Sequence, residues 1–146
     1  MVVPVNIKKL NENAKMPVRG SMAAAGYDVF ACIDKTIELL PHTTEKIGTG
    51  IAVEIPWGYW MGVYARSGLA TKEGLRPANC TGVVDADYRG EVIVALYNDS
   101  GETRYIQPGE KIAQLIVSPF ALWDIHEVEE LVETERGAGG FGSTGS

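Results

Sequence analysis

The clearest structural signal in the sequence is Glu91-Val92-Ile93-Val94-Ala95-Leu96-Tyr97, an apolar and β-branched run of the kind that forms buried strands. Two further runs have the same character, Lys111-Ile112-Ala113-Gln114-Leu115-Ile116-Val117 and Gly50-Ile51-Ala52-Val53-Glu54-Ile55-Pro56. Weaker strand candidates are Val2 to Ile7, Tyr27 to Ala31, Trp60 to Tyr64 and Ile125 to Leu131. The dominant period is two, which predicts an all-β protein.

Groups of turn-forming residues separate these runs at short intervals. Many short strands with frequent turns are typical of a β-sandwich or barrel. The one helical candidate is Ser67 to Glu73, a run that begins with Ser and has room for about two turns. The turn signals are Pro41-His42, Pro56-Trp57-Gly58, Asn98-Asp99-Ser100-Gly101 and Gln107-Pro108-Gly109-Glu110.

The length of 146 residues fits one domain, and 45% hydrophobic and 22% charged residues are ordinary for a soluble globular protein. No apolar run approaches the roughly 18 residues that a membrane helix needs, and the N-terminus lacks the features of a secretory signal. Cys32 and Cys80 could pair, but without such a signal we expect two buried free thiols. We therefore expect a protein that is not secreted and works in the cytoplasm, or in the nucleus if the source is eukaryotic or viral.

The formal net charge is −6, and Lys and Arg form no block. A nucleic-acid binder needs a basic surface, so the charge argues against that class. It is compatible with a nucleotide, because one Mg²⁺ and a few Arg side chains can hold a triphosphate locally. His42 and His126 have no companions at metal-ligand spacing, so we do not expect a zinc site.

The C-terminal segment from Arg136 to Ser146 is rich in glycine and cannot fold by itself. A frayed tail is the simplest interpretation. Alternatively, a flexible segment that carries an Arg, a Phe and hydroxyl groups can close over a ligand and become ordered only then. It lacks the Lys of a P-loop, which argues against a Walker-type NTPase.

Five segments concentrate Gly, Asp, Arg or Ser at the borders of predicted strands. Each alone is a turn signal, but together they supply carboxylates for a metal's water shell and for proton removal, and guanidinium and hydroxyl groups for phosphates. The five are Ala25-Gly26-Tyr27-Asp28-Val29, Ala65-Arg66-Ser67-Gly68-Leu69-Ala70, Asn79-Cys80-Thr81-Gly82-Val83-Val84-Asp85-Ala86-Asp87-Tyr88-Arg89-Gly90, Pro108-Gly109-Glu110-Lys111-Ile112-Ala113-Gln114-Leu115 and the glycine-rich tail.

In order and spacing, these segments resemble the five motifs of the trimeric dUTP diphosphatase (dUTPase) family. The resemblance implies a distorted jelly-roll barrel over residues 1–135, a flexible tail over 136–146 that closes over the active site, and a homotrimer whose subunits share the active sites. It also implies Mg²⁺-dependent hydrolysis of dUTP to dUMP and diphosphate, which keeps dUTP out of DNA and supplies dUMP for thymidylate synthesis. No nucleic-acid or membrane partner is expected.

The third motif carries the implied catalytic residue. Asp85 would be the general base that activates a water for in-line attack on the α-phosphorus; the alternative is that it only closes the hairpin turn. Tyr88 would pack against the deoxyribose and exclude a 2′-hydroxyl, or would be a plain hairpin aromatic. Asn79 and the hairpin backbone, including Gly82 and Val84, would read the uracil edge.

The other motifs supply the implied phosphate and metal contacts. Asp28 would hold waters on the Mg²⁺, or would be a turn carboxylate. Arg66, Ser67 and Gly68 would bind the phosphate chain near the start of the short helix, where N–H groups favour anions. Gln114 would contact the phosphates or the attacking water, or would be a strand residue that faces solvent. The implied tail contacts are Arg136 to the γ-phosphate, Phe141 stacked over uracil, and Gly142, Ser143 and Thr144 at the phosphates.

The main departure from the family pattern is at Ala65, Tyr64 before it is also less usual, and two alternative functions remain. Ala65 stands where the family usually has Pro; this loosens one backbone angle, and we expect little loss of function. Arg89 receives no role. A dCTP deaminase shares the architecture, but the hairpin from Asp85 to Gly90 has the diphosphatase form. A non-catalytic β-sandwich binding module would explain the strands and leave the Arg, Asp and Gly segments without a purpose.

Overall fold

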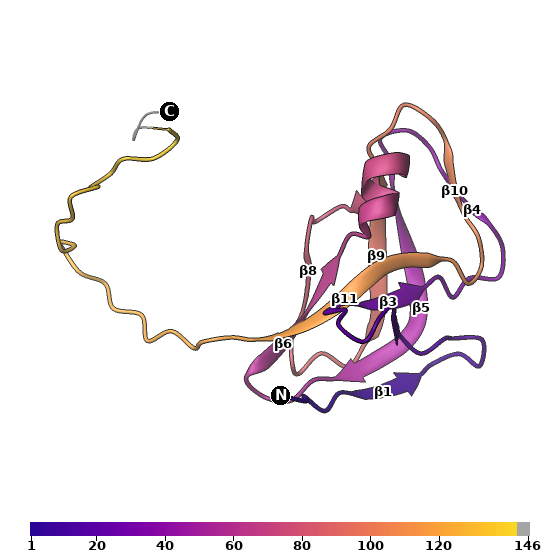
Figure 1. The fold of residues 1–146 in the computed structure, drawn as a ribbon, viewed down its shortest axis with the longest axis horizontal. Coiled ribbons are helices and arrows are strands. Elements are labelled where there is room, and N and C mark those ends of the chain that lie inside the picture. The colour runs from indigo at the N-terminus through magenta and orange to yellow at the C-terminus, as the bar shows by residue number, and fades with distance from the viewer. Residues whose placement is uncertain (143–146) are drawn as a thin grey trace.

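The computed structural model describes residues 1–142, and its eleven strands form three sheets (Figure 1). Neighbouring strands within each sheet are antiparallel. One sheet has the order β1-β5-β9-β7, another β2-β3-β11-β6-β8, and the pair β10-β4 forms the third. The elements are β1 (Asn6–Lys9), β2 (Val18–Arg19), β3 (Tyr27–Phe30), β4 (Ile37–Leu39), β5 (Thr44–Glu54), β6 (Tyr59–Tyr64), η1 (Leu69–Glu73), β7 (Leu75–Pro77), β8 (Gly82–Val84), β9 (Glu91–Asn98), β10 (Arg104–Ile106) and β11 (Lys111–Pro119). The predicted all-β fold is confirmed.

The three strongest strand predictions correspond to β9, β11 and β5, and the helical candidate corresponds to the short helix η1. Strand β9 shows the expected alternation, because Val92, Val94 and Leu96 are buried while Ile93 is exposed on the opposite face. Its period-two pattern places one face of the strand in the core and leaves the other for the surface.

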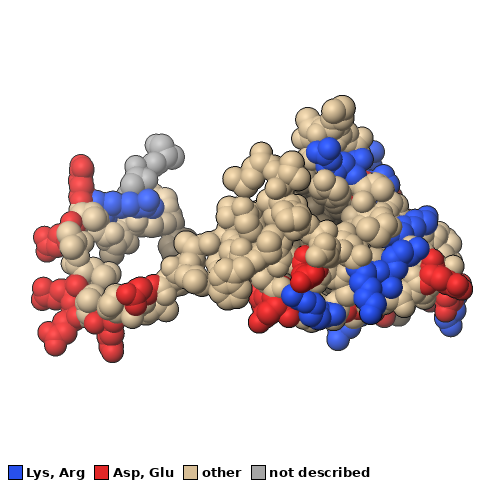
Figure 2. All heavy atoms as spheres, turned by 90° about the horizontal axis from the view of Figure 1, so that it is seen from below, with Lys and Arg blue, Asp and Glu red and all other residues tan. Residues whose placement is uncertain are grey.

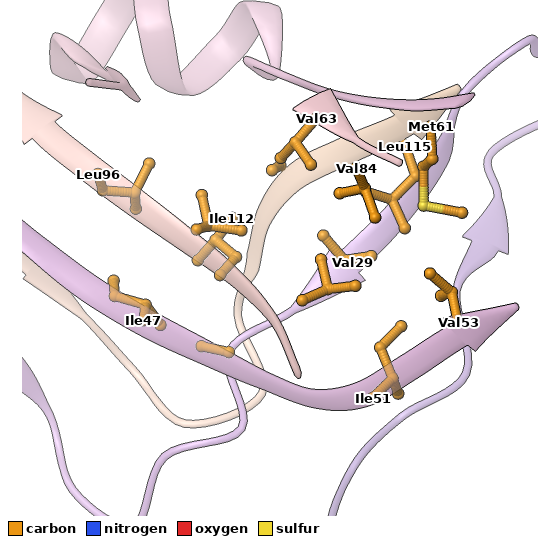
Figure 3. Packing of buried hydrophobic residues seen from close by; sticks show 14 of the residues in the cluster. Val29, Ile47, Ile51, Val53, Met61, Val63, Val84, Leu96, Ile112 and Leu115 are labelled. Atoms are coloured by element: carbon orange, nitrogen blue, oxygen red, sulfur yellow. The ribbon is translucent and has the colours of Figure 1, made fainter. Parts of the chain in front are cut away.

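The core lies between the two larger sheets, and apolar side chains from each of them point toward one another (Figure 3). Ile47, Ile51 and Val53 come from β5, and the side chains that face them include Val29 of β3 and Ile112 of β11. Burying each such side chain contributes about 1.5–3 kcal/mol to folding. This shared core holds the two larger sheets together, and the candidate site is built on the one that contains β6 and β8.

The pairing of β5 with β9 is interrupted by a bulge. Gly48 is opposite Ile93 and Ala52 is opposite Glu91, so three residues of β5 lie across from the single residue Val92. Thr49 is buried in this bulge and donates a hydrogen bond to the Val92 carbonyl at 2.6 Å. The bulge bends β5 where it passes the start of β9.

Strand structure ends at Pro119, and residues 120–142 leave the body of the molecule as an extended arm without helix or strand (Figure 1). The expected strand over Ile125 to Leu131 is therefore absent, because an isolated segment has no neighbouring strand to pair with. The last strand of the barrel, β11, ends at Pro119, whereas the barrel domain was expected to extend to residue 135.

Both cysteines are free, as predicted, but they are not both buried: Cys32 is half-buried and Cys80 is exposed. Cys80 is exposed because it lies in a tight turn with a backbone φ of 63°. Over residues 1–142, no helix is long and apolar enough to span a membrane.

Candidate active site

A hollow of about 210 Å³ lies beside the hairpin that joins β8 to β9. It brings together every candidate residue of the third motif. Its lining consists of Val63, Asn79, Gly82, Val83, Val84, Asp85, Tyr88, Glu91, Val92 and Ile93. Polar groups at the rim of a partly apolar hollow are typical of a small-molecule site.

Strand β8 forms the wall of the hollow because it pairs closely with β6. Gly82 is opposite Val63, and a Cβ on Gly82 would lie 3.0 Å from the Val63 Cβ, so only glycine permits this approach without displacement. A turn closed by the Cys80 N–H and the Pro77 carbonyl at 2.9 Å places Asn79 at the same hollow.

Asp85 closes the hairpin turn through its backbone and not through its side chain. The Tyr88 N–H donates to the Asp85 carbonyl at 3.2 Å. Among residues 1–142, no hydrogen bond or ion pair engages the Asp85 carboxylate, and the residue is exposed at the hollow. The structural and the chemical interpretations of Asp85 are therefore compatible, because they use different groups of the residue.

Arg89, which received no role from the sequence, supports this turn. Its Nη1 donates to the Ala86 carbonyl at 2.7 Å and to the Tyr88 carbonyl at 3.1 Å. Its Nη2 also lies 3.9 Å from a carboxylate oxygen of Glu54. The guanidinium satisfies carbonyls that the tight turn leaves without backbone partners.

A second cluster gathers the candidates of the first, second and fourth motifs on strands β3 and β11 of the same sheet and just beyond the end of β6. Asp28 in β3 is opposite Gln114 in β11, and Gln114 is opposite Tyr64 in β6. The Asp28 carboxylate lies 3.1 Å from the Nε of Arg66 and 2.9 Å from the Nζ of Lys111, with 16% of its side chain exposed. Sequence reasoning missed Lys111, although it lies in the fourth motif.

Gln114 holds the chain at the position that departs from the family pattern. Its Nε2 donates to the Ala65 carbonyl at 2.8 Å. This contact fixes the backbone directly before Arg66, where a proline ring would otherwise restrict it. Gly26 accommodates the glutamine, because a Cβ there would overlap the Gln114 side chain.

Ser67 and Gly68 lie at the exposed start of the helical turn that follows Arg66. The Arg66 carbonyl accepts a hydrogen bond from the Ala70 N–H at 2.9 Å, and the Ser67 carbonyl accepts one from the Thr71 hydroxyl at 2.7 Å. A Cβ on Gly68 would meet nothing within 4 Å, so the space beside it is open. The cationic side chains of Arg66 and Lys111, together with this open turn, form a surface that can bind phosphate oxygens.

One chain does not bring the two clusters together. Asp85 follows Val84, which is opposite Met61 near the beginning of β6, whereas Arg66 lies beyond the end of β6 at Tyr64. Five residues of extended chain separate Met61 from Arg66, a span of roughly 16 Å at about 3.3 Å per residue. Asp85 and Arg66 thus lie near opposite ends of β6, although the hollow itself reaches Val63.

The tail candidates lie apart from both clusters. Arg136 and Phe141 belong to the arm, which extends away from the body (Figure 1), and the Phe141 ring is fully exposed. The Arg136 Nε donates to the carbonyl of Gly139 at 2.8 Å, and Gly142 has a φ of 85°. Ser143 and Thr144 lie outside the described residues.

Comparisons with known proteins identify the family of this chain. The family model described as dUTPase matches residues 12–145. A deoxyuridine 5′-triphosphate nucleotidohydrolase of Nautilia profundicola is 48% identical over 97% of this chain and 98% of its own length. One from a Hydrogenobaculum species is 42% identical over 95% and 96%.

Solved structures of dUTPases have a similar fold. A mutant dUTPase of Staphylococcus bacteriophage 80alpha, determined with dUpNHpp, superposes with a TM-score of 0.88 and 32% identity over 98% of this chain and 99% of that one. A mutant dUTPase of the S. aureus phage phi11, described as revealing the coordination of a structural Mg(II) ion, has a TM-score of 0.78 and 31% identity over 87% of this chain and 97% of that one.

Proposed function

This chain belongs to the dUTPase family and is a dUTP diphosphatase, and we propose that Asp85 is the general base of its reaction. The observation that carries the proposal is the free Asp85 carboxylate at the rim of the hollow lined by Asn79, Gly82 and Tyr88. The carboxylate takes a proton from a water that attacks the α-phosphorus in line, and dUMP and diphosphate are the products.

The hollow is the proposed site of the base and sugar. Asn79 and the backbone of β8 read the donor and acceptor pattern of uracil, which cytosine reverses, and the confined space leaves no room for the methyl group of thymine. The half-exposed Tyr88 ring packs against the deoxyribose, where a 2′-hydroxyl would collide with it.

The second cluster is the proposed phosphate site. Arg66, Ser67 and Gly68 bind phosphate oxygens, and Gln114 orients the chain from which they extend. Lys111 belongs to this site as well, because its ammonium lies against Asp28.

The residues fit a Mg²⁺ that is held mainly by phosphate oxygens and water. Across residues 1–142, no group of three His, Cys, Asp or Glu side chains forms a protein cage for a metal. Mg²⁺ characteristically retains waters and binds through one or two carboxylates together with substrate phosphates. Asp28, which lies beside Arg66, would hold such waters, and the bound ion would neutralise phosphate charge.

We further propose a homotrimer in which neighbouring subunits complete each site. The separation of Asp85 from Arg66 within one chain supports this, because another subunit can supply the missing half. The arm supports it too, since Leu122, Trp123, Ile125 and Leu131 are exposed and can be buried only against another surface. In such an assembly the tail brings Arg136, Phe141, Gly142, Ser143 and Thr144 over a neighbour's site.

The free cysteines, one of them exposed, support a reducing compartment such as the cytoplasm. The carboxylates of the arm, which appear as a red cluster in Figure 2, make a nucleic-acid partner for that segment unfavourable.

The decisive experiment measures diphosphate release from dUTP, UTP, dTTP and dCTP in parallel, with Mg²⁺ and with EDTA. We expect release from dUTP alone, and its loss in EDTA. Ammonia release from dCTP would instead identify a deaminase of the same architecture. Folded protein that acts on none of the four would be a binding module.

A further inference from the structure

The β5 bulge lies opposite the start of β9, the strand that follows the hairpin carrying Tyr88. Its central residue, Gly50, has a φ of 68°, and a Cβ there would lie 2.8 Å from the Cys32 Sγ and 2.8 Å from the Ala14 Cβ. Gly50 is therefore required by its conformation and by its packing. The bulge is a rigid support in the core, to which the start of β9 can be attached.

Glu91 makes that attachment through its side chain. Its Oε1 accepts a hydrogen bond from the Gly50 N–H at 2.8 Å in a partly buried position. The carboxylate rests on Gly48, where an added Cβ would lie only 2.6 Å from the Oε1. Two glycines of β5 thus form a recess for one carboxylate, and a charge-assisted hydrogen bond fixes it there.

The backbone of the same residue holds Tyr88. The Tyr88 hydroxyl donates to the Glu91 carbonyl at 3.0 Å. The ring lies over Gly90, where an added Cβ would overlap the Tyr88 hydroxyl. The orientation of the ring therefore depends on the position of the Glu91 carbonyl, and that position depends on the Glu91 carboxylate in the bulge.

We infer that Glu91 is a positioning residue for sugar selectivity, acting through the orientation of the Tyr88 ring. Its carboxylate fixes the start of β9 on the Gly50 amide, and its carbonyl holds the Tyr88 hydroxyl, so the ring keeps the place that a 2′-hydroxyl would enter. This inference rests on the proposed contact between Tyr88 and the deoxyribose. Sequence reasoning treated Glu91 only as the first residue of a strand.

The test compares kcat/KM for dUTP with kcat/KM for UTP in the parent enzyme, in five single variants and in one double variant. Glu91→Ala removes the carboxylate, whereas Glu91→Gln keeps an oxygen that can accept the Gly50 N–H. Gly48→Ala displaces the carboxylate from outside the hollow, and Tyr88→Phe removes only the hydroxyl. Glu45→Ala, at an exposed carboxylate of β5, is the matched control.

We expect Glu91→Ala to lower the dUTP-to-UTP selectivity about tenfold, equivalent to about 1.4 kcal/mol. Gly48→Ala and Tyr88→Phe also lower the selectivity. Glu91→Gln and the control Glu45→Ala keep the selectivity of the parent enzyme. The Glu91→Ala, Tyr88→Phe double variant loses no more than either single variant, because both changes break one chain of contacts. Hydrogen exchange of residues 85–91 rises in Glu91→Ala, with Glu45→Ala again as the control.

Unchanged selectivity in folded Glu91→Ala and Gly48→Ala would overturn the inference, even if their thermal stability falls. Gly48→Ala and Tyr88→Phe keep the test decisive should Glu91→Ala not fold. A parent enzyme that hydrolyses dUTP and UTP equally would overturn the proposed role of Tyr88, and this inference with it. A selective parent with unaffected variants would overturn the role of Glu91 alone.

Discussion

The carboxylate of Asp28 lies 3.1 Å from the Nε of Arg66, although 38 residues separate the two in sequence. Strand β11 places Gln114 next to Asp28 on one side and next to Tyr64, at the end of β6, on the other. The Asp28 carboxylate, assigned to the metal's water shell, and the Arg66 guanidinium, assigned to the phosphates, are therefore in direct contact. Each can hold the other in place before substrate arrives, which lowers the cost of ordering them on binding.

Asp28→Asn should raise the Mg²⁺ concentration needed for half-maximal activity by about 10- to 100-fold, the range found when a residue that orients a metal's ligands is changed. The amide retains the shape of the side chain and removes its charge. Titration of activity with Mg²⁺ at saturating dUTP measures the effect, with Asp34→Asn at an exposed carboxylate as the control. An unchanged Mg²⁺ requirement would reduce Asp28 to a structural ion pair.

Asp85→Asn should retain nucleotide binding and lose about 10²- to 10⁴-fold in turnover, because general-base catalysis typically contributes that much. Single-turnover kinetics and calorimetric titration with a non-hydrolysable analogue separate the two effects. Asp87→Asn is the matched control, since Asp87 is an exposed carboxylate of the same turn. Equal rates for Asp85→Asn and the parent would show that another group activates the water.

Truncation after Glu135 should leave the folded assembly intact and reduce turnover sharply, because it removes the residues proposed to close over a neighbour's site. Truncation after Pro119 removes the exposed apolar arm as well and should abolish the trimer. Light scattering and diphosphate release distinguish the two truncations. Full activity after the first would make the tail a frayed end, and a stable trimer after the second would remove the arm from the interface.

Cys80 should react with a thiol reagent well before Cys32 at pH 8. Partial burial, and then the negative charges of Glu91 and Asp34, raise the pKa of the Cys32 thiol, and the raised pKa lowers its thiolate fraction at a given pH. Mass spectrometry of the labelled protein over pH 7–10 measures both rates. Faster labelling of Cys32 would contradict the packing around the β5 bulge.

The sequence by itself determined the three longest strands, β5, β9 and β11, and the identity of the motif residues, but it did not indicate the short strands β2, β4, β7, β8 and β10. Strand β9 alternates between core and surface, so its period is visible without any partner. The hairpin from Asp85 to Gly90 is likewise local, since its turn is closed by the Tyr88 N–H and the Asp85 carbonyl only three residues apart. Short-range hydrogen bonds and a period of two leave a signal in adjacent residues.

Only the tertiary structure decided which motifs meet. The contacts of Lys111 with Asp28 and of Glu91 with Gly50 depend on strand register and on the β5 bulge, which no local pattern records. The arm shows the converse: Ile125 to Leu131 has a strand-like sequence but forms no strand, because a strand needs a partner edge that one chain does not offer it. Residues distant in sequence are brought together by pairing and packing, and these depend on the whole chain and its neighbours at once.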